Sequence, residues 1–140
     1  MLAGYMKEMY QILHQNPEPP FKEYWTSELL SKELTRLGFD VKTGIGKTGV
    51  VGTLHGASPG PHLAIRSDMD ALPVEENTNV SYASKCEGMM HACGHDSHMA
   101  MLLGCSAWAA GMKDQLKGTL QVIFQPAEEI VEGAKAMLAD

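Results

Sequence analysis

The chain has 140 residues, of which 44% are hydrophobic, and its 11 basic and 17 acidic residues give a formal net charge of -6. This length corresponds to about one domain with enough apolar residues for a core, and the acidic balance argues against binding to nucleic acid or to an anionic membrane surface. Because no apolar run approaches the roughly 20 residues that span a bilayer and the N-terminus lacks a signal-like apolar core, we expect a cytoplasmic, globular domain.

The first part of the chain predicts two amphipathic helices. Residues 2–15 repeat apolar side chains at helical spacing, and the following segment "PEPPF" ends this helix because proline cannot continue one. Residues 22–39 repeat the helical pattern, and Gly38 is typical of the residue that follows a helix. Both helices are expected to pack against a sheet.

Four short apolar or alternating runs predict the strands of that sheet. They are residues 39–43, 49–56, 61–68 and 118–125. The connector "GASPG" predicts a hairpin between the second and third of these strands. A long helix over about residues 97–112 precedes the last strand, which indicates a crossover connection. The expected fold class is α/β, with a mixed sheet flanked by helices.

The segment "MHACGHDSH" at residues 90–98 concentrates metal-binding side chains. Cys93, His95 and Asp96 offer sulfur, nitrogen and oxygen ligands, which are the types that bind first-row divalent metals. The other cysteines, Cys86 and Cys105, are interpreted as plain thiols, and Cys105 as a core residue because its segment is apolar. Three unevenly spaced cysteines do not form a disulfide framework, which suits a reducing compartment.

Carboxylates follow two of the predicted strands, at the sheet edge where ligands gather in open α/β folds. Asp68 and Asp70 follow one strand, and Glu128 and Glu129 follow another. We expect these groups to converge with the cysteine and histidines. One of two adjacent glutamates can bind a metal while its neighbour accepts a proton from water. Such a pair is also typical of a solvated helix start, but its position after an apolar strand favours the first interpretation.

Three motifs, "RSDMDALPVEE", "GMMHACGHDSHMAMLLG" and "FQPAEE", resemble the signature segments of the M20 metallopeptidase family. More narrowly, they resemble its amidohydrolase branch, which includes hippurate hydrolases, N-acetyl amino acid deacetylases and auxin-conjugate hydrolases. The resemblance covers essentially the whole chain in the right order, including the early segment "LHQNPEPPFKEYWT". It implies that residues 1–140 are the N-terminal part of a zinc-exopeptidase-like catalytic domain.

The resemblance also implies roles for four residues in cleaving the amide bond of a small N-acyl amino acid or peptide-like substrate. Cys93, His95 and Glu129 would be ligands of a centre of two divalent ions, zinc or manganese. Glu128 would be the catalytic base that deprotonates a metal-activated water and passes the proton to the leaving amine. A metal would polarise the scissile carbonyl.

Asp68 and Asp96 are interpreted as residues that orient a metal-bound imidazole or other groups of the site. Arg66 stands where other branches of the family place a histidine ligand, and a permanent cation cannot bind a metal; the amidohydrolase branch also has arginine there. The remaining histidines are expected either beside the site or in surface and capping positions: His91 and His98 in the first group, and His14, His55 and His62 in the second.

The family places two further histidine ligands and a smaller lid and dimerisation domain beyond the segment at which this chain ends. We therefore expect a truncated chain that lacks this domain, is inactive alone, and exposes an unpaired strand edge that favours homo-oligomers. The chain also reads "PEPPF" where relatives typically read "PELSF".

Two other functions stay open at this point. A non-catalytic metal-binding or interaction fragment is predicted if the 140 residues are the natural protein. A hydrolase with Cys93 as nucleophile and a nearby histidine as base is also conceivable, although it leaves Glu128 and Glu129 without a role.

Overall fold

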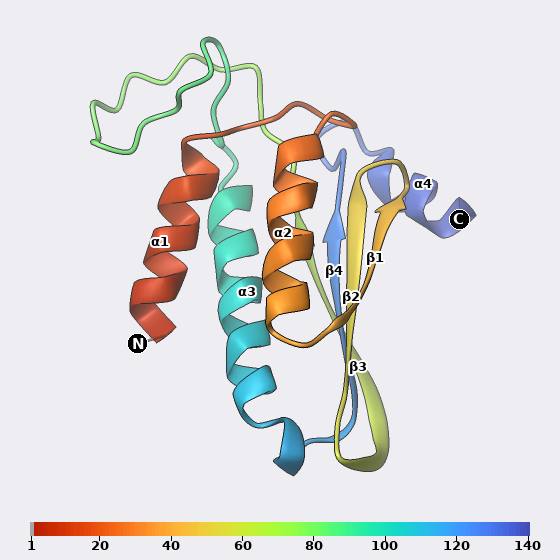
Figure 1. The fold of residues 1–140 in the computed structure, drawn as a ribbon. Helices are drawn as coiled ribbons and strands as arrows, with labels where there is room; N and C mark the ends of the chain where they lie inside the picture. The colour runs from red at the N-terminus through yellow and green to blue at the C-terminus, as the bar shows by residue number, and fades with distance from the viewer. Residues whose placement is uncertain (1) are drawn as a thin grey trace.

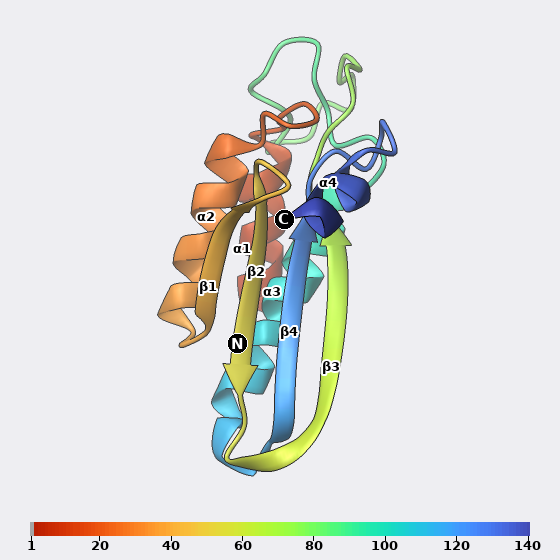
Figure 2. The ribbon, with the colours of Figure 1, turned by 90° about the vertical axis from the view of Figure 1, so that its right-hand side faces the viewer.

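A four-stranded sheet carries helices on both faces in the computed structural model, which describes residues 2–140 (Figure 1). The elements in chain order are α1 (Leu2–His14), α2 (Tyr24–Arg36), β1 (Asp40–Ile45), β2 (Gly49–His55), β3 (Ser58–Asp68), α3 (His95–Gly111), the 3-10 turn η1 (Lys113–Gln115), β4 (Lys117–Gln125) and α4 (Gly133–Ala139). Helices α2 and α3 cover one face of the sheet and α1 packs against α3. Helix α4 lies near the carboxyl end of β4 on the other face (Figure 2). The expected α/β class is confirmed.

The strand order is β1-β2-β4-β3, so the sheet is mixed as predicted. Strand β4 runs antiparallel to β2 and parallel to β3, and α3 forms the predicted crossover between the two parallel strands. The hairpin predicted at "GASPG" is wrong, because β4 lies between β2 and β3. The connector instead bonds to the start of β4, where the amides of Gly56 and Ala57 donate to the carbonyls of Gly118 and Leu116, each at 2.9 Å.

The hydrophobic core lies between the sheet and the helices α2 and α3. Its central side chains are almost fully buried: Val50, Leu54, Val122 and Phe124 from the sheet, and Leu30, Leu34, Met99 and Leu103 from the helices. Burial of such side chains stabilises the fold by roughly 1.5–3 kcal/mol each. The three helices predicted over residues 2–15, 22–39 and 97–112 are confirmed, with ends that differ by a few residues.

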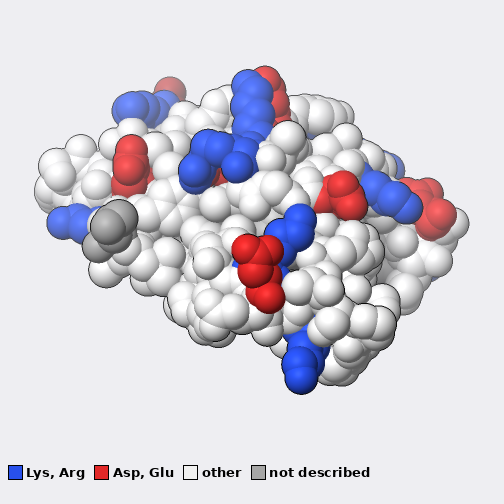
Figure 3. Space-filling view, turned by 60° about the horizontal axis from the view of Figure 1, so that its bottom comes forward, with Lys and Arg blue, Asp and Glu red and all other residues white. Residues whose placement is uncertain are grey.

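The end of the molecule away from the long loop carries basic and acidic side chains interspersed with one another (Figure 3). His55 and His62 lie exposed, as predicted. None of the helices within residues 2–140 combines the length and apolar character that crossing a membrane requires.

The candidate site lies where the carboxyl ends of β3 and β4 meet the N-terminus of α3 (Figures 1 and 2). The long loop of residues 69–94 crosses this end of the molecule, and an isolated bridge between Leu72 and Met90 joins its two arms. This topology brings the three sequence motifs to one place.

Candidate metal centre

His95 is the centre of a cluster of carboxylates at this end of the sheet. It is the first residue of α3 and is 2% exposed. Its Nε2 atom lies 3.7 Å from Asp68 Oδ2, 3.6 Å from Glu128 Oε2 and 3.7 Å from Glu129 Oε1. The structure thus brings together side chains from β3, α3 and the loop after β4.

The His95 ring is held from its other nitrogen. Nδ1 lies 2.8 Å from the backbone carbonyl of Asp70 and 3.5 Å from Asp70 Oδ1. Because a carbonyl oxygen only accepts hydrogen bonds, Nδ1 carries the proton in the neutral ring, and the lone pair of Nε2 faces the carboxylates. Burial lowers the pKa of His95, but Asp70 and Asp68 outweigh this effect and raise the pKa to about 9. The ring is therefore oriented as a metal-binding imidazole has to be.

Two overlapping groups of potential ligand atoms share His95. Cys93, His95 and Glu129 each offer an atom within 4.8 Å of the others, and Asp68, His95 and Glu128 form a second group within the same limit. The structure therefore gathers the three residues expected as metal ligands. It also places Asp68, which we expected to orient other groups, beside the expected base Glu128.

The residues of this cluster fit a divalent cation. Glu129 Oε1 is buried and has no hydrogen-bond partner among the described residues, which is unfavourable for a carboxylate, and a cation would satisfy it. Desolvation and the carboxylates of Glu129, Glu128 and Asp68 raise the pKa of the Cys93 thiol. A bound cation would reverse that effect by stabilising the thiolate.

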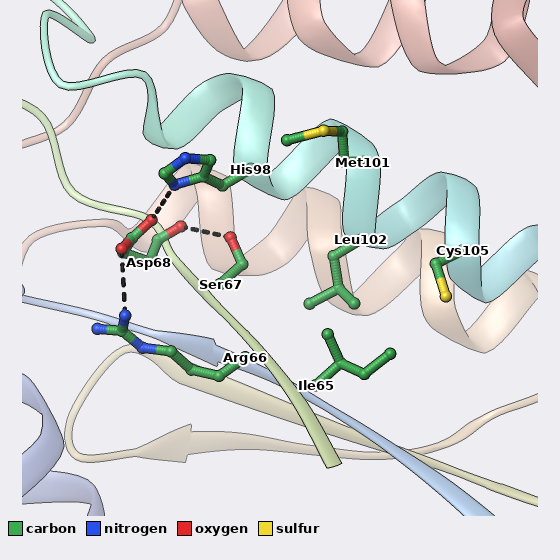
Figure 4. A pocket seen from close by; sticks show the side chains of 8 residues that line it. All are labelled: Ile65, Arg66, Ser67, Asp68, His98, Met101, Leu102 and Cys105. Carbon is green, nitrogen blue, oxygen red and sulfur yellow. Dashed lines mark hydrogen bonds and ion pairs between the residues drawn. The ribbon is translucent and has the colours of Figure 1, made fainter. Parts of the chain in front are cut away.

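Asp68 is fixed by two nitrogen donors on the side of the site that opens between β3 and α3 (Figure 4). Arg66 Nη1 donates to Asp68 Oδ2 at 3.3 Å, and Arg66 Nε donates to Gln125 Oε1 at 2.9 Å. His98 Nδ1 lies 2.8 Å from Asp68 Oδ1. Arg66, Asp68 and His98 line a cleft together with Cys105, which we predicted as a core residue but which is only partly buried. Cys105 is on the side of α3 that faces β3, the edge strand of the sheet.

The backbone of the loop after β4 presents Glu128 and Glu129. Asp70 Oδ1 accepts the amide of Glu128 and Asp70 Oδ2 accepts the amide of Glu129, each at 3.0 Å. Burial raises the pKa of Asp70, but the hydrogen bonds from His95 and the two amides outweigh it and lower the pKa. The two glutamates lie in a turn before α4 rather than in the first turn of that helix.

Asp96 points toward α1. Its Oδ2 atom lies 2.6 Å from His14 Nδ1, and Glu76 Oε1 lies 3.2 Å from His14 Nε2. The prediction that His14 is a surface or capping residue is wrong, since the residue is 4% exposed beneath the long loop. His91 is also buried, and neither of its ring nitrogens has a hydrogen-bond partner among the described residues.

The contacts of two carboxylates that support the site do not follow from the sequence. Asp70 is one: its place after the same strand as Asp68 predicts that it lies at the site, but not that it contacts His95 and the amides of Glu128 and Glu129. Glu23 is the other: it is 0% exposed, and it accepts the amide of Ala127 at 2.9 Å across 104 residues of sequence. No local pattern indicates a contact over that separation.

The chain is similar to known hydrolases along almost its whole length. Residues 64–140 match the model of peptidase family M20/M25/M40. Thermostable carboxypeptidase 2 of Saccharolobus solfataricus is 50% identical over 140 residues, covering 98% of this chain and 36% of the relative. Hippurate hydrolase of Campylobacter jejuni is 44% identical over 139 residues, covering 99% and 36%. The chain thus spans about a third of the length of these relatives.

A solved structure supports the same relationship. The YXEP protein of Bacillus subtilis, described as a dinuclear metal-binding peptidase from the M20 family, superposes with a TM-score of 0.93 at 40% identity, covering 99% of this chain and 39% of that chain. The fold and the resemblance expected from the three motifs are confirmed. This chain belongs to the peptidase family M20/M25/M40.

Proposed function

We propose that this chain is part of a metal-dependent amidohydrolase that cleaves the amide bond of N-acyl amino acids or similar peptide-like molecules. The observation that carries the proposal is the cluster around His95, in which ligand atoms of Cys93, His95 and Glu129 lie within 4.8 Å of one another. Relatives named hippurate hydrolase and N-acetyl-L-cysteine deacetylase support this class of substrate.

Cys93, His95 and Glu129 would hold a divalent ion, zinc or manganese, which supplies Lewis acidity toward an amide carbonyl and toward water when bound. The description of the Bacillus subtilis neighbour as dinuclear supports a centre of two ions. Asp70 keeps His95 Nε2 turned toward the cluster, and Arg66 and His98 hold Asp68 beside it. We expect Asp68 to orient groups of the site.

We propose that Asp96 acts on His95 indirectly, through the start of α3. One of its oxygens accepts the amide of Ser97 at 2.8 Å, and the other lies against His14. These contacts fix the start of α3, whose first residue is His95. Asp96 would therefore orient the imidazole through the helix rather than by touching the ring.

Glu128 is proposed as the catalytic base because it is the more accessible of the two glutamates. Its side chain is 39% exposed, whereas that of Glu129 is 18% exposed. An accessible carboxylate beside the centre can accept a proton from water and return it to the leaving amine. Glu129 has a buried oxygen without a hydrogen-bond partner in the described part of the chain, which suits a metal ligand instead.

The surroundings of Cys93 argue against its acting as a nucleophile. Nucleophilic cysteines depend on a lowered pKa, whereas desolvation and three carboxylates raise the pKa of this thiol. Activity that resists chelators and is lost on alkylation would instead support a cysteine-dependent hydrolase.

The metal assignment is tested by elemental analysis of the purified chain after exposure to zinc or manganese. We expect about one tightly held ion per chain, lost in Cys93→Ser and Glu129→Gln and kept in Glu128→Gln. A wild-type chain that folds but retains neither metal would contradict the assignment.

The activity is tested by replacing the matching segment of the Campylobacter jejuni hippurate hydrolase with this chain. The chimera is expected to hydrolyse hippurate, and Glu128→Gln is expected to lower its kcat by roughly a hundredfold or more. A folded, metal-loaded chimera that hydrolyses neither hippurate nor other N-acyl amino acids would contradict the proposed function.

A further inference from the structure

Three consecutive backbone amides after β4 each donate to a buried carboxylate. The amide of Ala127 donates to Glu23 Oε1 at 2.9 Å, and the amides of Glu128 and Glu129 donate to the two oxygens of Asp70. Asp70 is part of the cluster around His95. Glu23 precedes the first residue of α2 and comes from a different part of the fold.

The Glu23 side chain binds the Ala127 amide rather than the amides of its own helix, α2. A carboxylate just before a helix normally accepts amides of the first turn, but Glu23 makes no such bond. Those amides are instead bound by Glu18, at 3.1 and 2.8 Å. The second oxygen of Glu23 accepts the hydroxyl of Thr48 at 2.5 Å. Because a fully buried carboxylate is unfavourable without hydrogen bonds, both partners hold Glu23 in place.

The residue that Glu23 binds has a backbone conformation that needs support. Ala127 is 0% exposed and has a φ of 51°, in the left-handed region that non-glycine residues rarely adopt. Its carbonyl accepts the amide of Gly133 at 3.1 Å, which closes the turn that contains Glu128 and Glu129. Such conformations persist only when the surrounding structure holds them.

We propose that Glu23 is a positioning residue, which holds the Ala127 amide and thereby aims Glu128 and Glu129 at the metal centre. The inference rests on the roles proposed above for the two glutamates. The Glu23 side chain bonds to Thr48 and to the Ala127 amide. Glu23 therefore acts on the centre through the backbone of the turn.

The test compares three variants of the 140-residue chain: Glu23→Leu removes the acceptor, Glu23→Gln keeps an acceptor oxygen, and Thr48→Val removes only the other partner. Amide hydrogen exchange followed by NMR without metal reports the Ala127 bond, and zinc titration reports the site. In Glu23→Leu we expect the Ala127 amide to exchange at least about tenfold faster, while the core amide of Val122 stays protected. Zinc affinity should fall roughly ten- to a hundredfold.

Glu23→Gln is expected to restore both readouts to near the wild-type values, and Thr48→Val to leave the Ala127 exchange close to wild type. Faster exchange in Glu23→Leu without a change in zinc affinity would overturn the positioning role. If Glu23→Leu fails to fold, the wild-type chain and Glu23→Gln decide. A wild-type Ala127 amide that exchanges as fast as an unstructured one overturns the proposal, and a protected Ala127 amide that stays protected in Glu23→Gln, with zinc affinity near the wild-type value, supports it.

Glu129→Gln, measured alongside, separates this inference from the proposed function. If Glu129→Gln leaves zinc affinity unchanged, the ligand assignment fails, whatever the exchange of Ala127 shows. If Glu129→Gln weakens zinc binding but Glu23→Leu changes neither exchange nor affinity, the role of Glu23 is wrong and the function stands.

Discussion

His14 at the end of α1 and Asp96 at the start of α3 form a buried pair, with His14 Nδ1 2.6 Å from Asp96 Oδ2. Glu76 from the long loop contacts the other ring nitrogen, and the rings of Tyr10 and Tyr82 flank the imidazole. Burial lowers the pKa of His14, but the hydrogen bonds with Asp96 and Glu76 outweigh it and raise the pKa. The pair ties the first helix and the loop to the helix that begins at His95.

The raised pKa of His14 predicts how this contact depends on pH. A group whose pKa is higher in the folded protein stabilises the fold fully below its unfolded pKa, about 6.5 for histidine, and loses that effect as the pH rises through the folded pKa. His14→Gln should therefore lower the free energy of unfolding by about 3 kcal/mol at pH values below about 6.5, and by less in alkaline solution. The ionisable groups around the ring are Asp96, Glu76, Tyr10, Tyr82 and the buried His91.

Denaturant unfolding of the wild type and the variant at several pH values measures this difference. His55→Gln is the matched control, since that ring is 63% exposed and lies 3.6 Å from the exposed Asp40. A cost of His14→Gln that stays constant from acid to alkaline pH would contradict the prediction.

Asp70→Asn tests how one carboxylate serves both His95 and the turn that carries the glutamates. Asparagine offers one acceptor oxygen where the native residue accepts two amides, so one amide loses its partner at a cost of about 1–3 kcal/mol. Loss of the charge should also lower the pKa of His95 from about 9 toward its ordinary value. NMR titration of the metal-free chain measures that pKa. Asp114→Asn, at an exposed position, should leave it unchanged, and an unaltered His95 in Asp70→Asn would speak against the assigned contact.

Local patterns were sufficient to predict the helices and the segments that form the site. The apolar spacing in residues 2–14 and 24–36 and the ligand types at Cys93 and His95 depend on neighbouring positions alone. The order of the strands could not be read in this way. A short connector between β2 and β3 is compatible with a hairpin and also with the insertion of β4 between them, and only the packing of β4 against both neighbours decides.

The contacts that support the site could not be predicted from the sequence for a similar reason. His14 carries the polarity of a surface residue, and its burial depends on Asp96, which lies 82 positions away, and on a loop with no regular structure. Glu23 looks like an ordinary charged residue at the start of a helix until Ala127 is placed beside it. Such groups are polar yet buried, so hydrophobic patterning assigns them to the wrong side of the fold.

Two glycine substitutions in and around α3 should change stability in opposite directions. Gly94 has a φ of 86° between Cys93 and His95, so Gly94→Ala should cost about 1–2 kcal/mol and weaken zinc binding by shifting both ligands. Gly111 ends the same helix, and a Cβ added there would have no non-neighbouring atom of residues 2–140 within 4 Å. Gly111→Ala should therefore stabilise the fold by about 0.4–1 kcal/mol and leave zinc binding unchanged. Thermal unfolding and zinc titration check both. Equal effects of the two substitutions would show that the turn at Gly94 is not constrained.

Metal removal should change stability in a way that depends on the chemistry of the ion. A ligand that binds only the folded state at a hundredfold excess over its Kd stabilises by about 2.7 kcal/mol. Zinc should approach this stabilisation, because Cys93 and His95 offer sulfur and nitrogen ligands. Magnesium prefers oxygen ligands and should stabilise the chain far less at the same concentration. Chelation with EDTA should remove the stability that zinc adds. Glu129→Gln should abolish this gain in stability, and Glu132→Gln, at an exposed position, should preserve it. Equal stabilisation by zinc and magnesium would instead indicate a cation held by the carboxylates alone, without the cysteine and the histidine.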